Sequence, residues 1–278
     1  SFLVCMLSIQ LNAAIRIQSA MRMCLSRSMV KALVNMRKHE AAVMVQRRVR
    51  GWIEREWVTT MREKMKETAP ETPGSALYET SGLVSQYLGF HYGPPVLGIP
   101  NFPAACIDFL MNSVKLEHRN RCLDIGCAVG RSSFELAKHF QHVDALDYSS
   151  GFIEAAKRLQ QSGIIQYGIP TEGRLSNDCQ ISLESLLDSD IANRVTFQTG
   201  DACNLADEMH NYDLVFAGNL IDRLYQPQLF LNSITQRIRI GGWLVITSPY
   251  TWLEDYTPPS YWLGGYVDNS GIPIDTFT

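Results

Sequence analysis

The periodicity of hydrophobic and polar positions changes once along the chain. In residues 9–66, apolar side chains recur at helical spacing, as in Ile17, Met21 and Leu25. This segment has no proline and a single glycine, and it is rich in the strong helix formers Met, Arg, Ala, Leu, Lys and Gln. The pattern predicts one long helix, or two helices separated near His39.

From Tyr78 onward, short apolar runs alternate with amphipathic segments. Residues 67–75 (ETAPETPGS) carry two prolines and a glycine and are interpreted as a linker. The chain is therefore divided into three regions: a helical segment at 1–66, the linker at 67–75, and an α/β domain at 76–278. Strands are predicted at 121–126, 143–148, 194–202, 212–219 and 242–249, helices at 103–116, 132–140, 151–161 and 227–240, and an irregular insertion at 163–190. The alternation predicts a parallel sheet with helices on both faces, a Rossmann-like arrangement.

The formal net charge of −3 conceals a split between these regions. Residues 1–66 carry 13 basic and 4 acidic side chains, a net charge of +9, whereas the rest of the chain carries 12 and 24, a net charge of −12. Such an asymmetry indicates two modules with different partners.

The seven cysteines are an odd number, widely spaced, and form no CxxC pair. A disulfide framework and a zinc finger are therefore not expected, and a reducing, cytoplasmic setting is favoured. No apolar run approaches the ~20 residues that a membrane-spanning helix needs.

A glycine-rich turn lies between a predicted buried strand and a predicted helix, in the stretch Asp124-Ile-Gly126-Cys127-Ala128-Val-Gly130-Arg131. Small residues there allow a ligand to approach the backbone, and a helix N-terminus attracts negative charge. The dinucleotide fingerprint GxGxxG fails because Arg131 stands at its third small position, and the phosphate loop GxxxxGK[ST] is absent.

The spacing of Gly126, Ala128 and Gly130 after an acid resembles motif I of class I S-adenosylmethionine-dependent methyltransferases. The resemblance implies that this turn holds the methionine part of the cofactor. An acid 21 residues after Gly126 can accept both ribose hydroxyls, and the end of the third strand is where this family contacts adenine. The cofactor-binding residues so expected are Asp124, Gly126, Cys127, Ala128, Gly130, Arg131, Asp147, Tyr148, Asp201, Ala202 and Asn219.

Longer blocks, YETSGLVSQYLGFHYG (78–93), NFPAAC (101–106), LDIGCAVGRSSFELA (123–137), GDACNL (200–205), NLIDRLY (219–225) and SPYTWLEDYTP (248–258), resemble the C-terminal methyltransferase domain of ovothiol-biosynthesis enzymes, the 4-mercaptohistidine methyltransferase family. The likeness covers about residues 76–268. It implies methyl transfer from S-adenosylmethionine to an imidazole ring nitrogen of 5-thiohistidine. The class I fold usually closes with an antiparallel hairpin, whereas the sequence ends about 30 residues after the fifth predicted strand. Either the sequence is a fragment or this last hairpin is absent, and a fifth strand left uncovered would be costly as an exposed edge.

Methyl transfer from a sulfonium is an in-line displacement, so the protein mainly aligns the nucleophile and excludes water, and no metal is expected. An imidazole nitrogen is nucleophilic when the ring is neutral. An arginine, Arg131 or Arg223, would pair with a carboxylate, and aromatic residues would wall the sulfonium. The catalytic candidates are Tyr92, His91 and Asn219, and the substrate-binding candidates are Tyr78, Tyr87, Arg223, Tyr250 and Trp252.

Two stretches of the basic segment align internally and resemble the IQ motif, [IV]QxxxRGxxxR. The second fits at every defined position, and the first has Met23 where glycine is usual. An apolar stripe with basic flanks suits the acidic, Met-lined grooves of calmodulin and related EF-hand light chains. Anionic membranes, nonspecific nucleic-acid binding and coiled-coil packing are the competing interpretations, and calcium dependence stays open. The residues expected to bind calmodulin are Ile17, Gln18, Arg22, Arg27, Val45, Gln46, Arg50, Gly51 and Arg55.

Two alternatives to the thiohistidine acceptor remain. The same cofactor chemistry could serve another small amine, imidazole or thiol. The chain could also be a non-catalytic IQ scaffold with a degenerate methyltransferase-like domain. The intact Asp124, Gly126, Gly130, Asp147 and Asp201 favour cofactor binding, whereas the missing C-terminal strands favour the scaffold.

Overall fold

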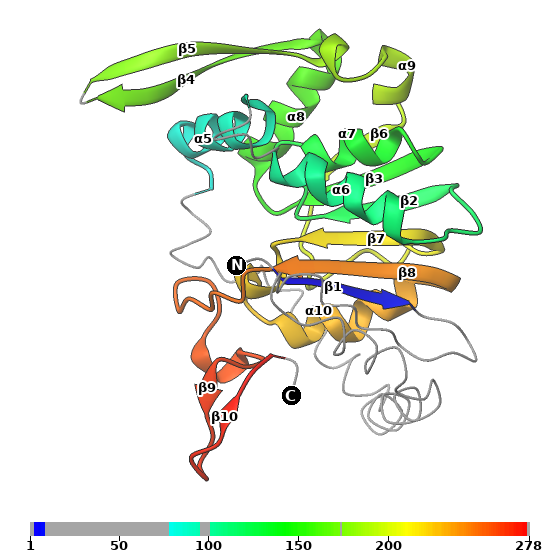
Figure 1. Cartoon of the computed structure of the whole chain (residues 1–278), viewed down its shortest axis with the longest axis vertical. Helices are drawn as coiled ribbons and strands as arrows, with labels where there is room; N and C mark the ends of the chain where they lie inside the picture. The colour runs from blue at the N-terminus through cyan, green and yellow to red at the C-terminus, as the bar shows by residue number, and fades with distance from the viewer. Residues whose placement is uncertain (1–2, 9–77, 95–100, 173, 277–278) are drawn as a thin grey trace.

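The computed structural model describes residues 3–8, 78–94, 101–172 and 174–276, so the linker and the IQ segments lie outside the described residues. Within this part, six strands form one sheet in the order β1-β8-β7-β2-β3-β6 (Figure 1). Their bounds are β1 Leu3–Ser8, β2 Arg121–Ile125, β3 His142–Asp147, β6 Val195–Thr199, β7 Tyr212–Gly218 and β8 Ile238–Ser248. All neighbours pair in parallel except β1 with β8. The predicted Rossmann-like α/β fold is confirmed.

Each face of the sheet has its own hydrophobic core. Along β7, Leu214 and Phe216 pack into one core, and Val215 and Ala217 pack into the other. The first core is covered by α6 (Phe102–Ser113), α7 (Arg131–Ala137) and α8 (Ser150–Ser162), and the second by α10 (Pro227–Ile234). Burial on both faces explains why the strands are nearly continuous apolar runs.

The longest described helix, α8, has 13 residues. None of the helices in the described ranges is long and apolar enough to cross a lipid bilayer.

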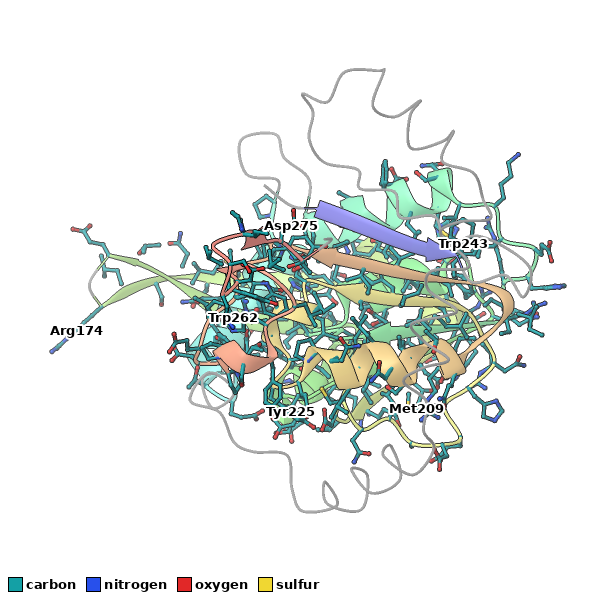
Figure 2. The ribbon with its side chains drawn as sticks, turned by 90° about the horizontal axis from the view of Figure 1, so that it is seen from below. Arg174, Met209, Tyr225, Trp243, Trp262 and Asp275 are labelled. Carbon is teal, nitrogen blue, oxygen red and sulfur yellow. The ribbon has the colours of Figure 1, made fainter. Side chains whose placement is uncertain are left out.

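The segment 163–190, predicted to be irregular, forms a β-hairpin. Strands β4 (Ile164–Glu172) and β5 (Leu175–Ser182) pair antiparallel, followed by η1 (Leu183–Ser185) and α9 (Ser189–Ala192). Buried and exposed residues alternate only at the base of the hairpin, where Ile165 and Tyr167 are buried. The outer part is mostly polar and exposed. Figure 2 shows Arg174 at its outer tip, away from the body of the domain. The apolar periodicity is therefore too short to predict the strands.

The hairpin base packs on α5 (Ser81–Tyr92). A Cβ atom at Gly89 would lie 2.8 Å from Cδ1 of Ile169, so the two elements approach closely only because position 89 lacks a side chain. The hairpin thereby supports a helix that, as shown below, contributes to the cavity wall.

The helix predicted at 227–240 ends earlier. A 3₁₀ turn, η3 (Thr235–Arg237), follows α10, and β8 begins at Ile238, which pairs with Tyr212. The Arg237 guanidinium donates to the carbonyl groups of Leu205 and Ala206 and is almost fully buried. This tertiary contact ends the helix at a place where the local sequence carries no stop signal.

The edge of the fifth predicted strand, β8, is not exposed. Strand β1 pairs antiparallel with it from Leu3 opposite Ser248 to Ser8 opposite Trp243, and so satisfies its edge hydrogen-bonding groups. The costly exposed edge is thus avoided, and residues 3–8 belong to the sheet rather than to the predicted helical segment. In the described residues no later strand joins the sheet, because β9 (Tyr266–Val267) and β10 (Pro273–Ile274) pair with each other.

The packing around the glycine-rich turn can be tested by two matched substitutions at positive φ. Gly163 (φ +71°) has open space where a Cβ would lie, whereas a Cβ at Gly130 (φ +85°) would lie 2.7 Å from Cζ of Phe197. Gly163→Ala should lower the free energy of unfolding by about 1 kcal/mol through backbone strain. Gly130→Ala should lower it by about 2–4 kcal/mol, because overpacking is added to the strain. Urea unfolding of both variants measures the difference, and equal losses would contradict the described packing.

Candidate functional site

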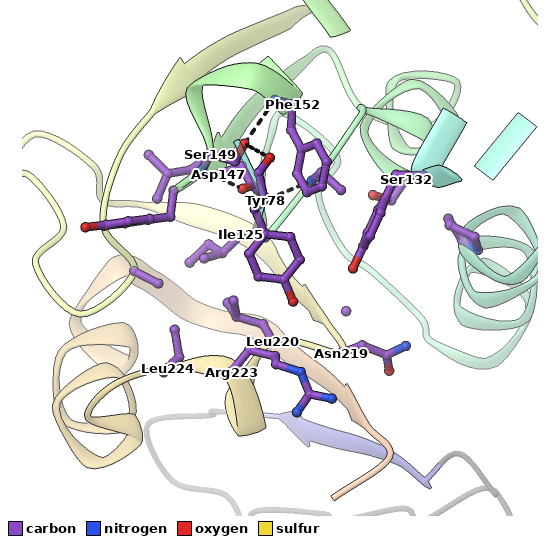
Figure 3. A pocket seen from close by; sticks show the side chains of 18 of the residues that line it. Tyr78, Ile125, Ser132, Asp147, Ser149, Phe152, Asn219, Leu220, Arg223 and Leu224 are labelled. Atoms are coloured by element: carbon purple, nitrogen blue, oxygen red, sulfur yellow. Dashed lines mark hydrogen bonds between the residues drawn. The ribbon is translucent and has the colours of Figure 1, made fainter. Parts of the chain in front are cut away.

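A cavity of about 530 Å³ opens where the carboxyl ends of β2, β3, β6 and β7 meet (Figure 3). This is the edge at which open α/β sheets bind ligands. The cavity is walled by the glycine-rich turn, by the loops after β3, β6 and β7, by one side of α5 and by Tyr256.

The glycine-rich turn is held to β3 by hydrogen bonds. The Gly126 N–H donates to the Leu146 carbonyl at 2.8 Å, and the Ala128 N–H donates to Oδ2 of Asp147 at 2.8 Å. Ala128 adopts φ +48°, which is uncommon for a residue with a Cβ and marks a tightly determined backbone. The turn therefore presents backbone to the cavity in one defined shape.

Asp147 ends β3 and lines the cavity beside this turn. Its Oδ1 accepts from the Ser149 N–H at 2.9 Å, so each carboxylate oxygen has a backbone donor, and lone pairs remain for a ligand. Burial raises the pKa of Asp147 to about 6, although hydrogen bonding to the backbone of Ser149, Ala128 and Tyr148 lowers it. A half-buried carboxylate with this free capacity can accept the two hydroxyls of a ribose.

Asp201 follows β6 on the same side of the cavity. Its Oδ1 accepts from the Cys203 N–H at 2.8 Å, and its Oδ2 accepts from the Tyr225 hydroxyl at 2.8 Å. Burial raises the pKa of this carboxyl also. The pair of acids, with Ala202 beside them, forms a polar half of the cavity.

Asn219 closes the end of β7 with its amide fixed in orientation. Its backbone has φ +53°, its N–H donates to the Thr247 carbonyl at 2.7 Å, and the Thr247 hydroxyl donates to its Oδ1 at 3.0 Å. The bond from Thr247 fixes which way the amide points, and the side-chain NH₂ group is then a donor for a ligand.

Arg223 provides a fixed positive charge in the cavity wall. Its Nη1 donates to Oδ2 of the buried Asp222 at 3.0 Å and to the Thr251 carbonyl at 2.9 Å, and its Nη2 donates to the Thr251 hydroxyl at 3.1 Å. The guanidinium also lies 5.0 Å from the centroid of the Tyr256 ring. None of these contacts uses Nε, so a donor remains for an anionic group.

His91 is 7% exposed and lines the cavity from α5. Its Nδ1 has no hydrogen-bond partner among the described residues. Burial, and secondarily the charge of Arg131, lower the pKa of His91 to about 3, so the ring is neutral at physiological pH. A neutral imidazole with an unused nitrogen can hydrogen-bond a ligand, but it is a weak proton acceptor.

The structure does not bring Tyr92 to the cavity. Its hydroxyl donates to the Val129 carbonyl at 2.8 Å, and its ring lies under the Arg131 guanidinium. One helical step of 100° separates it from His91, which turns it toward the back of the glycine-rich turn. Arg131 pairs with Glu135 at 2.8 Å rather than facing the cavity. Neither side chain lines the cavity.

Five other predicted residues lie outside the cavity lining. Asp124 is fully buried, where its Oδ2 accepts from the hydroxyls of Ser132 and Ser133 at 2.7 and 2.6 Å and ties β2 to α7. Cys127 and Gly130 belong to the turn but do not line the cavity: Cys127 is fully buried, and Gly130 packs against Phe197. Trp252 stacks on Trp262. Tyr250 does not reach the cavity either. These side chains support the site instead of forming it.

The remaining predicted residues of this domain meet at the cavity, namely Tyr78, Tyr87, His91, Gly126, Ala128, Asp147, Tyr148, Asp201, Ala202, Asn219 and Arg223. The lining residues that sequence reasoning missed include Gln86, Phe90, Phe102, Pro103, Ser149, Phe152 and Tyr256. Gln86 and Phe90 share one side of α5 with Tyr87 and His91, so helical spacing could have found them. No local signal marks the others.

Comparisons with known proteins agree with this architecture. Residues 123–246 match the family model described as a methyltransferase domain, and residues 11–28 and 39–58 match the IQ calmodulin-binding motif. No curated protein matches the chain. The chain therefore contains a methyltransferase domain of the class I, Rossmann-like fold and two IQ motifs.

Several solved structures resemble part of this chain at low identity and with TM-scores below 0.5. The YcgJ protein from Bacillus subtilis is 13% identical, with 49% of this chain and 46% of that chain covered and a TM-score of 0.36. The glycopeptide N-methyltransferase MtfA, solved with S-adenosylmethionine, is 16% identical (52% and 53% covered, TM-score 0.37). A phosphoethanolamine N-methyltransferase from Haemonchus contortus is 21% identical (60% and 32% covered, TM-score 0.42). The chain spans about a third to a half of the length of these structures.

The cavity residues fit S-adenosylmethionine, the cofactor consistent with this fold. Asp147 has free acceptor capacity for the ribose, Asp201 and Ala202 lie at the expected adenine end, and the backbone of Gly126 and Ala128 is open to the methionine part.

The raised pKa of Asp147 predicts a pH-dependent cofactor affinity. Binding to ribose hydroxyls favours the ionised carboxylate, so the association constant for S-adenosylmethionine should fall about tenfold per pH unit below about pH 6. Calorimetry between pH 5 and 8 measures this slope. Asp124 also has a pKa of about 6 but does not line the cavity, so Asp147→Asn should weaken binding and remove the slope. A slope that persists in this variant would assign the titration to another group.

Proposed function

We propose that this chain is an S-adenosylmethionine-dependent methyltransferase that acts on an imidazole ring nitrogen of 5-thiohistidine. The observation that carries the proposal is that one cavity joins a ribose-binding acid to a compartment with a neutral imidazole, aromatic walls and one fixed cation. Asp147 stands at the first end, and His91, Tyr87 and Arg223 form the second. A planar acceptor that bears a carboxylate complements this second compartment in shape and charge.

The residues of the chain act here by positioning. Bound S-adenosylmethionine would supply an activated methyl group on a sulfonium. Arg223 would pair with the acceptor carboxylate, and the Asn219 NH₂ group would donate to a second acceptor atom. His91, which is neutral, would hydrogen-bond one ring nitrogen and so keep the lone pair of the other directed at the methyl carbon. The ring nitrogen would accept the methyl group, the electron pair of the broken C–S bond would stay on sulfur, and the ring would release a proton to water.

The acceptor can be tested directly with S-adenosylmethionine and 5-thiohistidine. Calorimetry should show cofactor binding, and mass spectrometry should show a methylated product. Arg223→Met should raise the acceptor KM at least tenfold and change the cofactor Kd less than twofold, because the guanidinium serves only the acceptor. Arg158→Met, which removes an exposed charge on α8, is the matched control.

Two results would redirect the proposal. Cofactor binding without product would indicate another small acceptor. Absence of cofactor binding would indicate a non-catalytic scaffold, in which the IQ motifs carry the function.

We further propose that residues 11–28 and 39–58 bind calmodulin or a related EF-hand light chain. Two IQ matches and a net charge of +9 over residues 1–66 support this partner, because EF-hand lobes offer acidic, Met-lined grooves. The binding residues lie outside the described part of the chain.

Partner binding can be measured by pull-down with calmodulin in calcium and in chelator. The full chain should be retained in at least one condition. The double substitution Gln46→Ala and Arg50→Ala should reduce retention at least fivefold, since it removes two motif positions. Arg62→Ala, a basic residue outside both matched ranges, is the control. Equal loss with the control would favour nonspecific electrostatic binding.

A further inference from the structure

Residues 78–80 cross the N-terminus of α8 immediately before α5 begins. The Ser149 hydroxyl, which caps α8, donates to the Tyr78 carbonyl at 3.0 Å. Thr80 caps α5 by accepting from the Leu83 N–H at 3.3 Å. The short segment thus connects the start of one helix to the start of the other.

Glu79 fastens this segment to α8. Its Oε1 accepts from the Ser150 N–H at 3.1 Å, and its Oε2 accepts from the Ser150 hydroxyl at 2.8 Å and from the Gly151 N–H at 3.2 Å. Partial burial raises the pKa of Glu79, but these hydrogen bonds outweigh burial and bring the pKa below its ordinary value. A carboxylate is favoured at this place because the first N–H groups of a helix lack intrahelical partners.

The neighbouring Tyr78 reaches into the cavity. Its ring centroid lies 5.6 Å from that of Phe152 on α8, 6.1 Å from that of Tyr87 on α5 and 5.8 Å from that of Tyr256 after β8. Figure 3 shows the Tyr78 side chain between Asp147 and Ser149 on one side and Leu220 and Arg223 on the other. Tyr78 is therefore the point at which three separate elements of the wall meet.

We propose that Glu79 is a positioning residue for the acceptor compartment. It clamps residues 78–80 onto the N-terminus of α8 and so holds Tyr78 across the cavity, between the cofactor acid and Arg223. The inference rests on the proposed methyltransferase function and adds the element that sets the shape of the acceptor site. Glu79 itself is exposed and does not line the cavity. Its charge raises the pKa of Asp147 and so acts on the cofactor end, whereas its effect on the acceptor compartment passes through Tyr78.

A double-mutant cycle separates this role from a general loss of stability. Glu79→Ala should raise the acceptor KM about tenfold and lower kcat less than threefold, because the compartment loosens while the reacting groups remain. The same substitution in a Tyr78→Ala background should change KM less than twofold, since no ring is left to position. Glu154→Ala, which removes an exposed acid from α8, should leave both constants unchanged. Additive effects of Glu79→Ala and Tyr78→Ala would overturn the proposal.

Hydrogen exchange tests the clamp without any substrate. The Ser150 and Gly151 amides, which donate to Glu79, should be protected in the wild-type chain and should exchange at least tenfold faster in Glu79→Ala, but not in Glu154→Ala. Unchanged exchange would overturn the clamp whatever the enzyme assay shows. Faster exchange in a chain that binds no S-adenosylmethionine would instead leave the clamp standing and remove the proposed function.

Discussion

The carboxylate of Asp147 is the contact on which the organisation of the site depends. One oxygen accepts from the backbone of Ala128 in the glycine-rich turn, and the other accepts from the backbone of Ser149 at the start of α8. Through the Ser149 hydroxyl the connection continues to Tyr78, and through it to the aromatic wall. A single acid thus joins the two parallel strands β2 and β3 to the segment that precedes α5. Its burial raises its pKa, so the same arrangement that orders the turn makes the carboxylate titrate at higher pH.

The two halves of the cavity have different charge. Asp147 and Asp201 make the first half acidic, which suits hydroxyl and amino donors. The second half contains Arg223, the Asn219 amide and a neutral His91. Arg223 is rigid because the buried Asp222 and Thr251 hold its guanidinium, so its orientation does not have to be established when a ligand binds. Preorganisation of this kind suits a reaction in which alignment, rather than acid–base chemistry, lowers the barrier.

Several supporting residues were predicted to be ligand contacts because they share the motif with residues that line the cavity. Asp124, Cys127, Gly130 and Arg131 belong to the same eight-residue stretch as Gly126 and Ala128, yet of these six only Gly126 and Ala128 line the cavity. Asp124 orders the first turn of α7 through two serine hydroxyls, and Gly130 allows Phe197 to pack against the turn. A linear motif marks the loop that a ligand approaches, but it does not distinguish its inner face from its outer face.

The sequence by itself determined the alternation of strands and helices and the two IQ motifs. It also placed candidate site residues after successive parallel strands, among them the acids at the ends of β3 and β6. These features depend on local periodicity and on short spacings, which are written along the chain. Tertiary structure decided the rest. It turned Tyr92 away from His91, paired β1 with the edge of β8, ended α10 at the buried Arg237, and brought Tyr78, Tyr87 and Tyr256 together. Each of these outcomes arises from contacts between residues distant in sequence, whose energies no local pattern records.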